Sequence, residues 1–339
     1  MLRFAVVGYG FMGTVHARTL MAHPDVELAA VVDEDADRLS QITAGNIDLA
    51  DVAPLPPSVK RLRHFDALLD DGNLNGVSIC LPTHLHRRYA VAALEAGLDV
   101  VCEKPMALNL EDCDAMIEAS RANGRRLFIA QCIRFWPEYE VLERTVRSGD
   151  LGDLMSLSLH RLSAPPGWGG DKGWFWDGEK SGGCLFDLHV HDLDFLHQLL
   201  GEPESVQSRG LHDSNGINTA VTTLYHYPGG PLCCSEGSWL RPAGFKMSYF
   251  AVFERGELQY DSSAAPTISR GEGVFEPIEL PEGDGYSREY DYFIRCLAGN
   301  EKGDRMTPQS ARTSIKIALA EARSIRSGKP EPISGEEAE

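Results

Sequence analysis

The stretch that decides the fold is FAVVGYGFMGTVHARTLMAH, residues 4–23. An apolar run leads into three glycines, after which apolar residues recur at helical spacing, so the pattern predicts a strand, a tight turn and a helix. In a GxGxxG turn the first glycine permits the bend, the second lets the backbone approach a diphosphate, and the third lets the helix pack on the strand. The diphosphate of a dinucleotide then lies at the helix N-terminus. The predicted contacts in this turn are Gly8, Gly10, Phe11, Met12 and Gly13.

The next segment, VELAAVVDEDADR, predicts a second strand that ends at Asp33. An acidic residue about 20 positions after a glycine turn accepts hydrogen bonds from the adenosine ribose hydroxyls. The alternative is a chance glycine turn followed by a solvated acidic loop. Because Asp33 and Glu34 repel a 2′-phosphate, the sequence favours NAD over NADP, and Arg38 weakens that preference.

Strand and helix patterns continue to alternate through residues 75–123, with NGVSICLP, HRRYAVAALEAG, DVVCEKPMAL and a helix from about Leu110 to Asn123. This order predicts a parallel sheet whose ligands bind at the carboxyl ends of the strands. Lys104 falls at such an end, so we expect it near the nicotinamide. Glu103 is either a structural partner or a ligand contact. The predicted cofactor contacts at this edge are Leu81, Pro82, Thr83, His86, Glu103 and Lys104.

Bulk properties exclude several classes of protein. With 339 residues, 43% of them hydrophobic, two domains are expected, and a net charge of -18 argues against nucleic acid or an anionic membrane as partner. We find no apolar run long enough to cross a membrane and no signal-peptide pattern at the N-terminus, so a cytoplasmic protein is expected. Eight cysteines without CxxC spacing indicate reduced, mostly buried thiols. The adjacent Cys233 and Cys234 are assigned no role.

From about residue 124 the composition becomes rich in β-forming residues. Runs such as RLFIAQCIRFWPEY, LMSLSLHRLSAPPG and FKMSYFAVFERGELQYD predict strands of a largely antiparallel sheet. We therefore predict a dinucleotide-binding domain over residues 1–122 and a second α/β domain over residues 123–339. A final amphipathic helix is expected to start at Thr307 and Pro308 and to stop at Gly328.

The segment SGGCLFDLHVHDLDFLHQLLG, residues 181–201, carries six acidic or imidazole side chains in an otherwise apolar helix. At about 100° per residue, Asp187, His191 and Asp194 fall within about 60° of one another. His189 lies about 160° from His191, so the two histidines of HVH do not form one bidentate unit. A divalent metal and a merely solvated stripe remain alternatives, and no metal is predicted. Gly182 and Gly183 are expected to let the chain approach a cofactor or substrate closely.

Taken in order, GYGFMGTVHA, Asp33, LPTHLHRRYAVAALEAG, CEKP and SGGCLFDLHVHDLD resemble the glucose-fructose oxidoreductase/inositol dehydrogenase (Gfo/Idh/MocA) family over nearly the whole chain. The resemblance implies a Rossmann domain followed by an α/β domain with an open, mostly antiparallel sheet. That sheet often forms the oligomer interface, which implies a homodimer or homotetramer. Lys104 matches the lysine of the family's EKP motif, and Asp187 and His191 match its aspartate and catalytic histidine. Thr83 departs from the asparagine common after the proline.

The chemistry of alcohol oxidation fits these residues. Hydride leaves a carbinol carbon as its hydroxyl loses a proton, so a base must contact that oxygen, and His191 is the candidate. Asp187 is expected to orient the imidazole or to bind a neighbouring hydroxyl, and Lys104 to stabilise alkoxide charge. Asp194 either supports the helix or binds a second hydroxyl. His189 and His197 are expected to be structural.

The sequence thus supports the hypothesis of an NAD(H)-dependent oxidoreductase that interconverts a secondary alcohol and a ketone on a polyol, cyclitol or sugar. An NAD-recycling glycosidase or lyase and a cofactor-sensing regulator are the alternatives on the same fold. Trp168, Trp174 and Trp176 suit the apolar face of a sugar ring or cover a hydrophobic edge. Arg161 is a further candidate to face the cleft. The predicted substrate contacts are Lys104, Arg134, Trp168, Asp187 and His191.

Overall fold

The computed structural model describes residues 1–40, 54–70, 72–167, 173–271 and 273–334. The chain forms two compact units, each with its own sheet. The first comprises Met1–Gln131, Gly167–Trp174 and Tyr286–Arg312, and the second comprises Cys132–Pro166, Phe175–Gly285 and Thr313–Glu339. Among the helices of the described ranges, none is long and apolar enough to cross a membrane.

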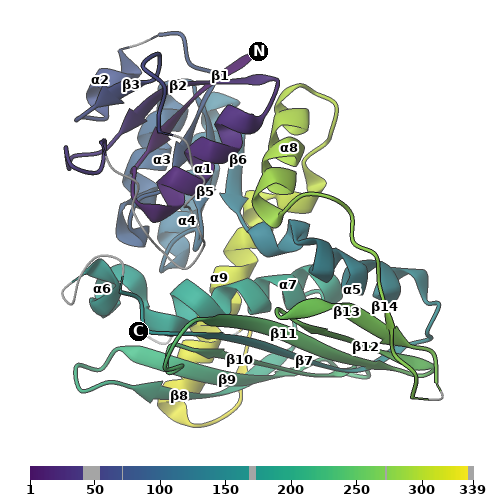
Figure 1. Ribbon diagram of the computed structural model, residues 1–339. Helices are drawn as coiled ribbons and strands as arrows, with labels where there is room; N and C mark the ends of the chain where they lie inside the picture. The colour runs from purple at the N-terminus through teal and green to yellow at the C-terminus, as the bar shows by residue number, and fades with distance from the viewer. Residues whose placement is uncertain (41–53, 71, 168–172, 272, 335–339) are drawn as a thin grey trace. The chain divides into compact units, whose positions relative to one another are not determined.

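The first unit contains a six-stranded parallel sheet with the order β3-β2-β1-β4-β5-β6 (Figure 1). This is the strand order of the doubly wound dinucleotide-binding fold, which confirms the predicted Rossmann architecture. The strands are short and mostly buried. They are β1 (Leu2–Val7), β2 (Val26–Val32), β3 (Lys60–Leu62), β4 (Gly76–Ile79), β5 (Asp99–Glu103) and β6 (Leu127–Ala130).

Among the helices of this unit, α4 (Leu110–Asn123) begins and ends at capping residues. The helix predicted from Leu110 to Asn123 is confirmed: the Asn109 side chain accepts a hydrogen bond from the Asp112 N–H at 2.8 Å, and Gly124 ends the helix in the left-handed conformation. The helices are α1 (Phe11–Ala22), α2 (Asp66–Leu69), α3 (His86–Glu95), α4 (Leu110–Asn123) and, from much later in the chain, α8 (Gly285–Leu297).

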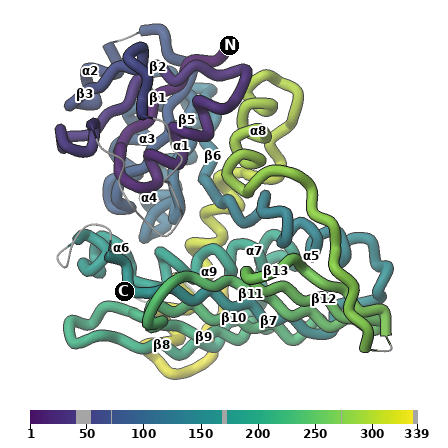
Figure 2. Tube along the Cα trace, in the orientation of Figure 1, coloured from purple at the N-terminus to yellow at the C-terminus, as the bar shows by residue number. Residues whose placement is uncertain are grey.

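Helix α8 returns to the first unit after the chain has formed most of the second (Figure 2). Its Phe293 ring stacks on Phe128 of β6 with the ring centroids 4.8 Å apart. Strand β6 itself was expected in the antiparallel sheet, but it pairs in parallel with β5. The predicted domain boundary after residue 122 therefore differs from the structure. LFIA is too short and too uniformly apolar for its periodicity to reveal which sheet it joins.

The second unit contains a nine-stranded sheet with the order β14-β13-β12-β11-β7-β10-β9-β8-β15. Among the described strands of this second sheet, only β7 and β10 pair in parallel, which confirms the predicted, mostly antiparallel sheet. Its strands are β7 (Leu154–Ser163), β8 (Ser205–His212), β9 (Asn218–His226), β10 (Leu232–Ser238), β11 (Phe245–Phe253), β12 (Gly256–Asp261), β13 (Ala264–Ser269), β14 (Glu276–Pro277) and β15 (Glu331–Pro332).

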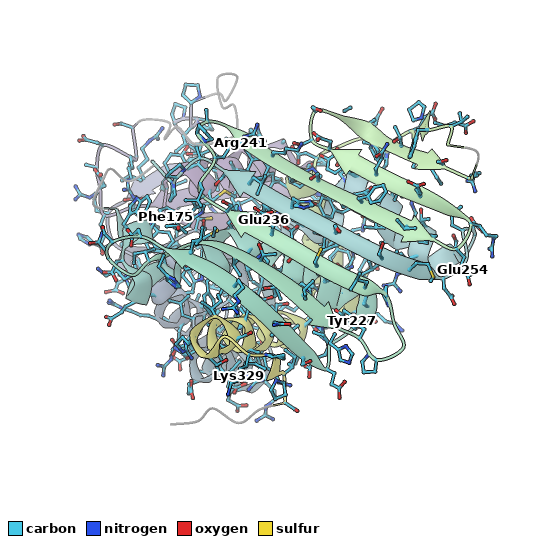
Figure 3. The ribbon with its side chains drawn as sticks, turned by 90° about the horizontal axis from the view of Figure 1, so that it is seen from below. Phe175, Tyr227, Glu236, Arg241, Glu254 and Lys329 are labelled. Carbon is cyan, nitrogen blue, oxygen red and sulfur yellow. The ribbon has the colours of Figure 1, made fainter. Side chains whose placement is uncertain are left out.

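One face of this sheet is covered by helices and the other is open. Helix α5 (Pro137–Ser148) and helix α7 (Val190–Leu200) lie over the covered face (Figure 1). Figure 3 shows the opposite face, where no helix crosses β7, β9, β10 or β11. Helix α9 (Pro308–Ser327) begins after Thr307 and ends before Gly328, whose φ is +69°, as the sequence predicted. The unit thus has a helical side that carries the charged segment and a bare β side.

Candidate functional site

The three glycines of the first turn serve different purposes. A Cβ on Gly8 would lie 2.5 Å from the Cys80 carbonyl oxygen, and one on Gly13 would lie 1.9 Å from the Gly8 carbonyl oxygen, so the fold itself requires both glycines. A Cβ on Gly10 would meet only the Arg38 guanidinium, at 4.0 Å. In the described chain no side chain caps the N-terminus of α1. Gly10 therefore leaves room for a ligand at an uncapped helix start, which fits a dinucleotide diphosphate.

This difference between the glycines predicts two separable phenotypes. Gly10→Ala is expected to change the free energy of unfolding by less than about 1 kcal/mol, because the new methyl group meets open space. It should nevertheless weaken NADH binding at least roughly tenfold, a loss of about 1.4 kcal/mol, by filling the diphosphate position. Gly13→Ala is expected to destabilise the fold by about 2 to 4 kcal/mol through a backbone clash. Denaturant unfolding and NADH fluorescence titration check both, and equal effects of the two substitutions on stability would contradict the assignment.

Asp33 lies where the ribose-binding acid was predicted, just after β2. Its Oδ2 accepts a hydrogen bond from the Tyr9 N–H at 2.8 Å, and its Oδ1 accepts one from the Asp35 N–H at 2.9 Å. The carboxylate is thereby fixed beside the glycine turn. The Arg38 guanidinium lies 3.9 Å from the Asp33 carboxylate and 3.6 Å from the Asp35 carboxylate. These two carboxylates therefore balance the positive charge of Arg38.

A cleft of about 220 Å³ lies beside this acidic loop within the first unit. The Phe65 and Tyr89 rings meet edge to face with centroids 5.1 Å apart, and the Arg88 guanidinium lies 5.3 Å above the Tyr89 ring. Aromatic and guanidinium planes of this kind suit a flat heterocyclic base. Sequence reasoning missed this cleft because its walls come from three separate segments. They are Glu34, His64, Phe65, Asp66, Arg88, Tyr89 and Ala92.

Lys104 follows β5 at the carboxyl edge of the parallel sheet, as predicted, and is partly exposed. Glu103 was counted as a cofactor contact, but it is only 6% exposed. Its Oε1 lies 2.9 Å from the His16 Nε2, and its Oε2 accepts a hydrogen bond from the Lys104 N–H at 3.0 Å. The structure thus favours the structural role for Glu103 over the cofactor contact.

His86 and Thr83 are also interior residues. The two ring nitrogens of His86 face the main-chain oxygens of Pro105 and Leu81, at 2.9 and 2.8 Å. Burial lowers the pKa of His86, so the neutral ring donates to one carbonyl at a time. His86 therefore ties the loop after β4 to the chain after Lys104, and the structure disfavours its predicted cofactor contact. Thr83 is buried at the start of a 3₁₀ turn, while Leu81 and Pro82 are partly exposed.

Phe11 and Met12 begin α1, and their side chains pack in a small apolar cluster with Val15 and Tyr286. Because both side chains take part in this packing, the predicted cofactor contacts of Phe11 and Met12 would be made by their backbone atoms. Sequence reasoning overlooked Gln131, which follows β6 beside the Lys104 edge and is 1% exposed. Within the described chain neither atom of its amide has a hydrogen-bond partner, and an orphaned amide of this kind fits a polar ligand.

In the second unit, burial divides the charged segment into two groups. Asp187 and His191 are partly exposed, whereas His189, Asp192 and Asp194 are buried. Burial therefore separates Asp194 from Asp187 and His191 and favours the alternative in which Asp194 supports the helix over the one in which it binds a hydroxyl. Residues Leu185–His189 form a π-helical turn, which advances by less than 100° per residue and changes the angular relations that a regular α-helix would give.

Asp194 belongs to a buried ion pair instead. The Arg134 guanidinium donates to both Asp194 oxygens at 2.7 and 2.6 Å, and the Ser314 hydroxyl donates to Asp194 at 2.6 Å. Arg134 was predicted to bind substrate, but it is 2% exposed and held by this carboxylate. Sequence reasoning missed the pair because its members lie far apart in the chain.

Arg161 forms a second buried pair of the same kind. Its guanidinium donates to both Asp192 oxygens at 3.1 and 2.7 Å and to the Tyr139 hydroxyl at 3.2 Å. Arg161 was a candidate to face the cleft, and the structure places it inside the second unit. Both arginines anchor the charged helix rather than line its partly exposed side.

His189 anchors the π turn to the sheet beneath it. Its Nε2 lies 3.1 Å from the Tyr225 hydroxyl, 3.2 Å from the Ser235 hydroxyl and 3.3 Å from a Glu321 carboxylate oxygen. A Cβ on Gly237 would lie 2.7 Å from the His189 Cβ, so this glycine makes room for the imidazole. The structural role expected for His189 agrees with these contacts.

The paired glycines before the π turn were expected to approach a ligand. Both have positive φ, and a Cβ on Gly183 would lie 2.7 Å from the Asn218 carbonyl oxygen of β9. The Asn218 side chain also accepts a hydrogen bond from the Leu185 N–H at 3.2 Å. The chain therefore approaches its own sheet here, and Gly182 and Gly183 set the start of the π turn rather than contact a substrate.

Of the tryptophans, Trp168 lies outside the described residues. Trp176 packs against the buried Trp239, with ring centroids 5.8 Å apart, and its Nε1–H donates to the Pro166 carbonyl at 3.3 Å. This packing favours the second of the two predicted roles, in which Trp176 covers a hydrophobic edge.

Within the described ranges no cluster of three or more His, Cys, Asp or Glu side chains has an arrangement that could hold a metal ion.

Comparison with known proteins places this geometry in context. The model of an oxidoreductase family with an NAD-binding Rossmann fold matches residues 2–131, and the GFO/IDH/MocA C-terminal domain model matches residues 139–259. Myo-inositol 2-dehydrogenase of Thermotoga maritima is 26% identical, over 99% of this chain and 92% of that protein. Inositol 2-dehydrogenase 1 of Paenarthrobacter aurescens is 30% identical, over 89% of this chain and 87% of that protein.

Solved structures show the same fold. A levoglucosan dehydrogenase, in complex with NADH and levoglucosan, superposes with a TM-score of 0.83 at 17% identity, covering 98% of this chain and 100% of that one. Both domain models, the full-length relatives and the two-sheet architecture agree. The chain therefore belongs to the Gfo/Idh/MocA oxidoreductase family, and its first domain is the NAD-binding Rossmann domain of that family.

Proposed function

We propose that this protein is an NAD(H)-dependent dehydrogenase that interconverts a secondary alcohol and a ketone on a cyclitol, sugar or sugar derivative. The observation that carries the proposal is the division of the charged segment by burial. Asp187 and His191 remain partly exposed, whereas the neighbouring Asp192 and Asp194 each form a buried ion pair with an arginine. An imidazole and a carboxylate are thus accessible at the surface of the second unit, on a chain related to inositol dehydrogenases.

Within this reaction His191 takes the proton of the substrate hydroxyl, and Asp187 orients the imidazole and stabilises its charged form. Lys104 donates a hydrogen bond to the reacting oxygen and stabilises negative charge there. When bound, NAD supplies the hydride acceptor. The turn at Gly8, Gly10 and Gly13 would hold its diphosphate, with Gly10 leaving the room for it, Asp33 would bind the adenosine ribose, and the cleft at Tyr89 would take the adenine. NADP is disfavoured because the Asp33 carboxylate would repel a 2′-phosphate.

The decisive experiment screens a panel of inositols, aldoses, sugar acids and nucleotide sugars and measures NADH formation by its absorbance. We expect stoichiometric NADH formation with at least one cyclic polyol or sugar, and a much weaker signal with NADP. Substrate consumption without net NADH would indicate an NAD-recycling glycosidase or lyase instead. Tight NADH binding without turnover of any substrate would indicate a cofactor-sensing regulator and would overturn the proposal.

The open face of the nine-stranded sheet supports a homodimer or homotetramer as the working form. A row of paired positions crosses this face from Phe250 through Ser158 and Cys234 to Leu224. Both end members are exposed apolar side chains, which favours burial against a second copy. Analytical ultracentrifugation of Phe250→Glu should show smaller particles than the parent protein, and an unchanged mass would count against this interface.

We further propose a cytoplasmic location, and cell fractionation tests it.

A further inference from the structure

A buried histidine lies behind Lys104. His16 of α1 is fully buried in the first unit, and its Nε2 lies 2.9 Å from the Oε1 of Glu103. The other Glu103 oxygen accepts the hydrogen bond from the Lys104 N–H. A side chain on the first helix is thus connected, through one carboxylate, to the backbone of the residue that the proposed function places at the reacting oxygen.

The opposite side of the His16 ring is closed by two hydroxyl groups. Its Nδ1 lies 2.7 Å from the Ser78 Oγ of β4 and 2.8 Å from the Tyr290 hydroxyl of α8, and the Tyr290 hydroxyl donates to Ser78 at 2.8 Å. Ser78 Oγ in turn lies 3.5 Å from the Cys80 Sγ. When both ring nitrogens carry a proton, every donor in the network has an acceptor: imidazolium to Glu103 and Ser78, tyrosine to serine, and serine to sulfur.

From these contacts we infer that His16 and Tyr290 are positioning residues for Lys104, acting through Glu103. The inference rests on the proposed role of Lys104 in the reaction. A carboxylate that is free to change rotamer would leave the Lys104 N–H without its partner and let the end of β5 move. The imidazolium of His16 fixes that carboxylate, and Tyr290 and Ser78 fix the imidazolium. A displacement of the Lys104 ammonium by about 1 Å is enough to slow a reaction by roughly 10²-fold.

Electrostatics keep this pair ionised at neutral pH. Burial lowers the pKa of His16, but the neighbouring Cys80 and Glu103 side chains raise it by more, so the pKa lies well above its usual value. Burial raises the pKa of Glu103, but the hydrogen bond and charge of His16, with Lys104 and His86, lower it overall. Tyr290 also faces the ring, with Glu289 beside it in sequence.

The direction of the pH dependence follows. A histidine whose pKa is raised by folding contributes stability that is present at low pH and is lost as the pH rises through the folded-state pKa. Above that pH the neutral ring no longer holds the Glu103 carboxylate as an ion pair. We therefore expect kcat of the wild-type enzyme to fall on the alkaline side in part because His16 loses its proton.

Two substitutions on one helix provide the matched test. Tyr290→Phe removes the hydroxyl beside His16, and Tyr292→Phe removes a hydroxyl of α8 that accepts a hydrogen bond from the Arg305 N–H instead. With a substrate from the panel, Tyr290→Phe should lower kcat by about 3- to 10-fold, the worth of one hydrogen bond, with KM and the NADH Kd unchanged. Tyr292→Phe should leave kcat at the wild-type level.

His16 itself is tested with a conservative and a disruptive variant. His16→Leu should lower kcat by roughly 10- to 100-fold. His16→Gln keeps a donor to Glu103 and should restore most of the loss, but without the alkaline titration step that His16 contributes to kcat. NADH fluorescence titration verifies that each variant binds cofactor and is folded.

The outcomes separate this inference from the proposed function. If Lys104→Ala retains full activity, the assigned role of Lys104 is wrong and the positioning role is wrong with it. If Lys104→Ala is inactive while His16→Leu and Tyr290→Phe keep the wild-type kcat and pH profile, only the positioning role is overturned. Equal losses in Tyr290→Phe and Tyr292→Phe would also overturn it, because a general packing defect of α8 would then explain both.

Discussion

Replacing His191 by alanine is expected to lower kcat by roughly 10²- to 10⁴-fold, the usual contribution of a general base. The physical reason is that the substrate hydroxyl then loses its proton to water rather than to a positioned imidazole. NADH affinity should survive, because His191 belongs to the second unit while the dinucleotide-binding turn lies in the first. Steady-state kinetics with a substrate from the panel, together with NADH fluorescence titration, measure both quantities.

The matched control is His197→Ala, the same substitution later on α7. His197 is also partly exposed, and burial lowers its pKa, but the mechanism assigns it no contact with substrate. Its kcat should stay near the wild-type value. Equal losses in the two variants would point to a damaged helix. Wild-type turnover in both His191→Ala and Lys104→Ala would overturn the assigned chemistry.

Replacing Arg134 by methionine is expected to destabilise the protein by about 3 to 5 kcal/mol, because it leaves the Asp194 carboxylate buried without its partner. The control is Arg147→Met on α5, whose guanidinium is exposed and pairs with Glu143 at the surface. Surface pairs of this type contribute at most about 1 kcal/mol. Urea unfolding of both variants gives the comparison.

The same substitution decides between two roles for Arg134. If Arg134→Met leaves the free energy of unfolding unchanged but raises KM for the substrate, the original prediction of a substrate contact is correct and the structural interpretation is wrong. The double variant Arg134→Met/Asp194→Leu is expected to recover much of the lost stability, because it removes the unpaired charge and fills the space with apolar atoms.

The parts of the fold that were predictable carry local signals. The glycine turn and the ends of α4 and α9 each depend on residues within a few positions of one another, and Asp33 lies at a characteristic spacing of about 20 positions after that turn. Local chemistry also placed Lys104 at the end of β5, because a buried strand of a parallel sheet must present its next residue at the carboxyl edge.

The parts that failed depend on partners far away in the sequence. The accessible side of the charged helix was set by Arg134 and Arg161, whose pairing with Asp194 and Asp192 no helical angle can reveal. The π turn altered the angle between Asp187 and the residues after it, and the N–H of its first residue, Leu185, donates a hydrogen bond to the Asn218 side chain on β9. These interactions form only when the tertiary structure is assembled. The periodicity and spacing of residues in the sequence therefore do not predict them.

The return of helix α8 has a consequence for biosynthesis. At roughly 5 to 20 residues per second, on the order of 10 to 30 s separate the emergence of β6 from that of α8 at the ribosome. During this interval the nascent first unit lacks the Phe293 ring that stacks on Phe128 and the Tyr290 hydroxyl that reaches His16. The nucleotide-binding unit therefore cannot mature in the order of its strands. Its completion waits for a late segment of the chain, which links the timing of its folding to translation of the second unit.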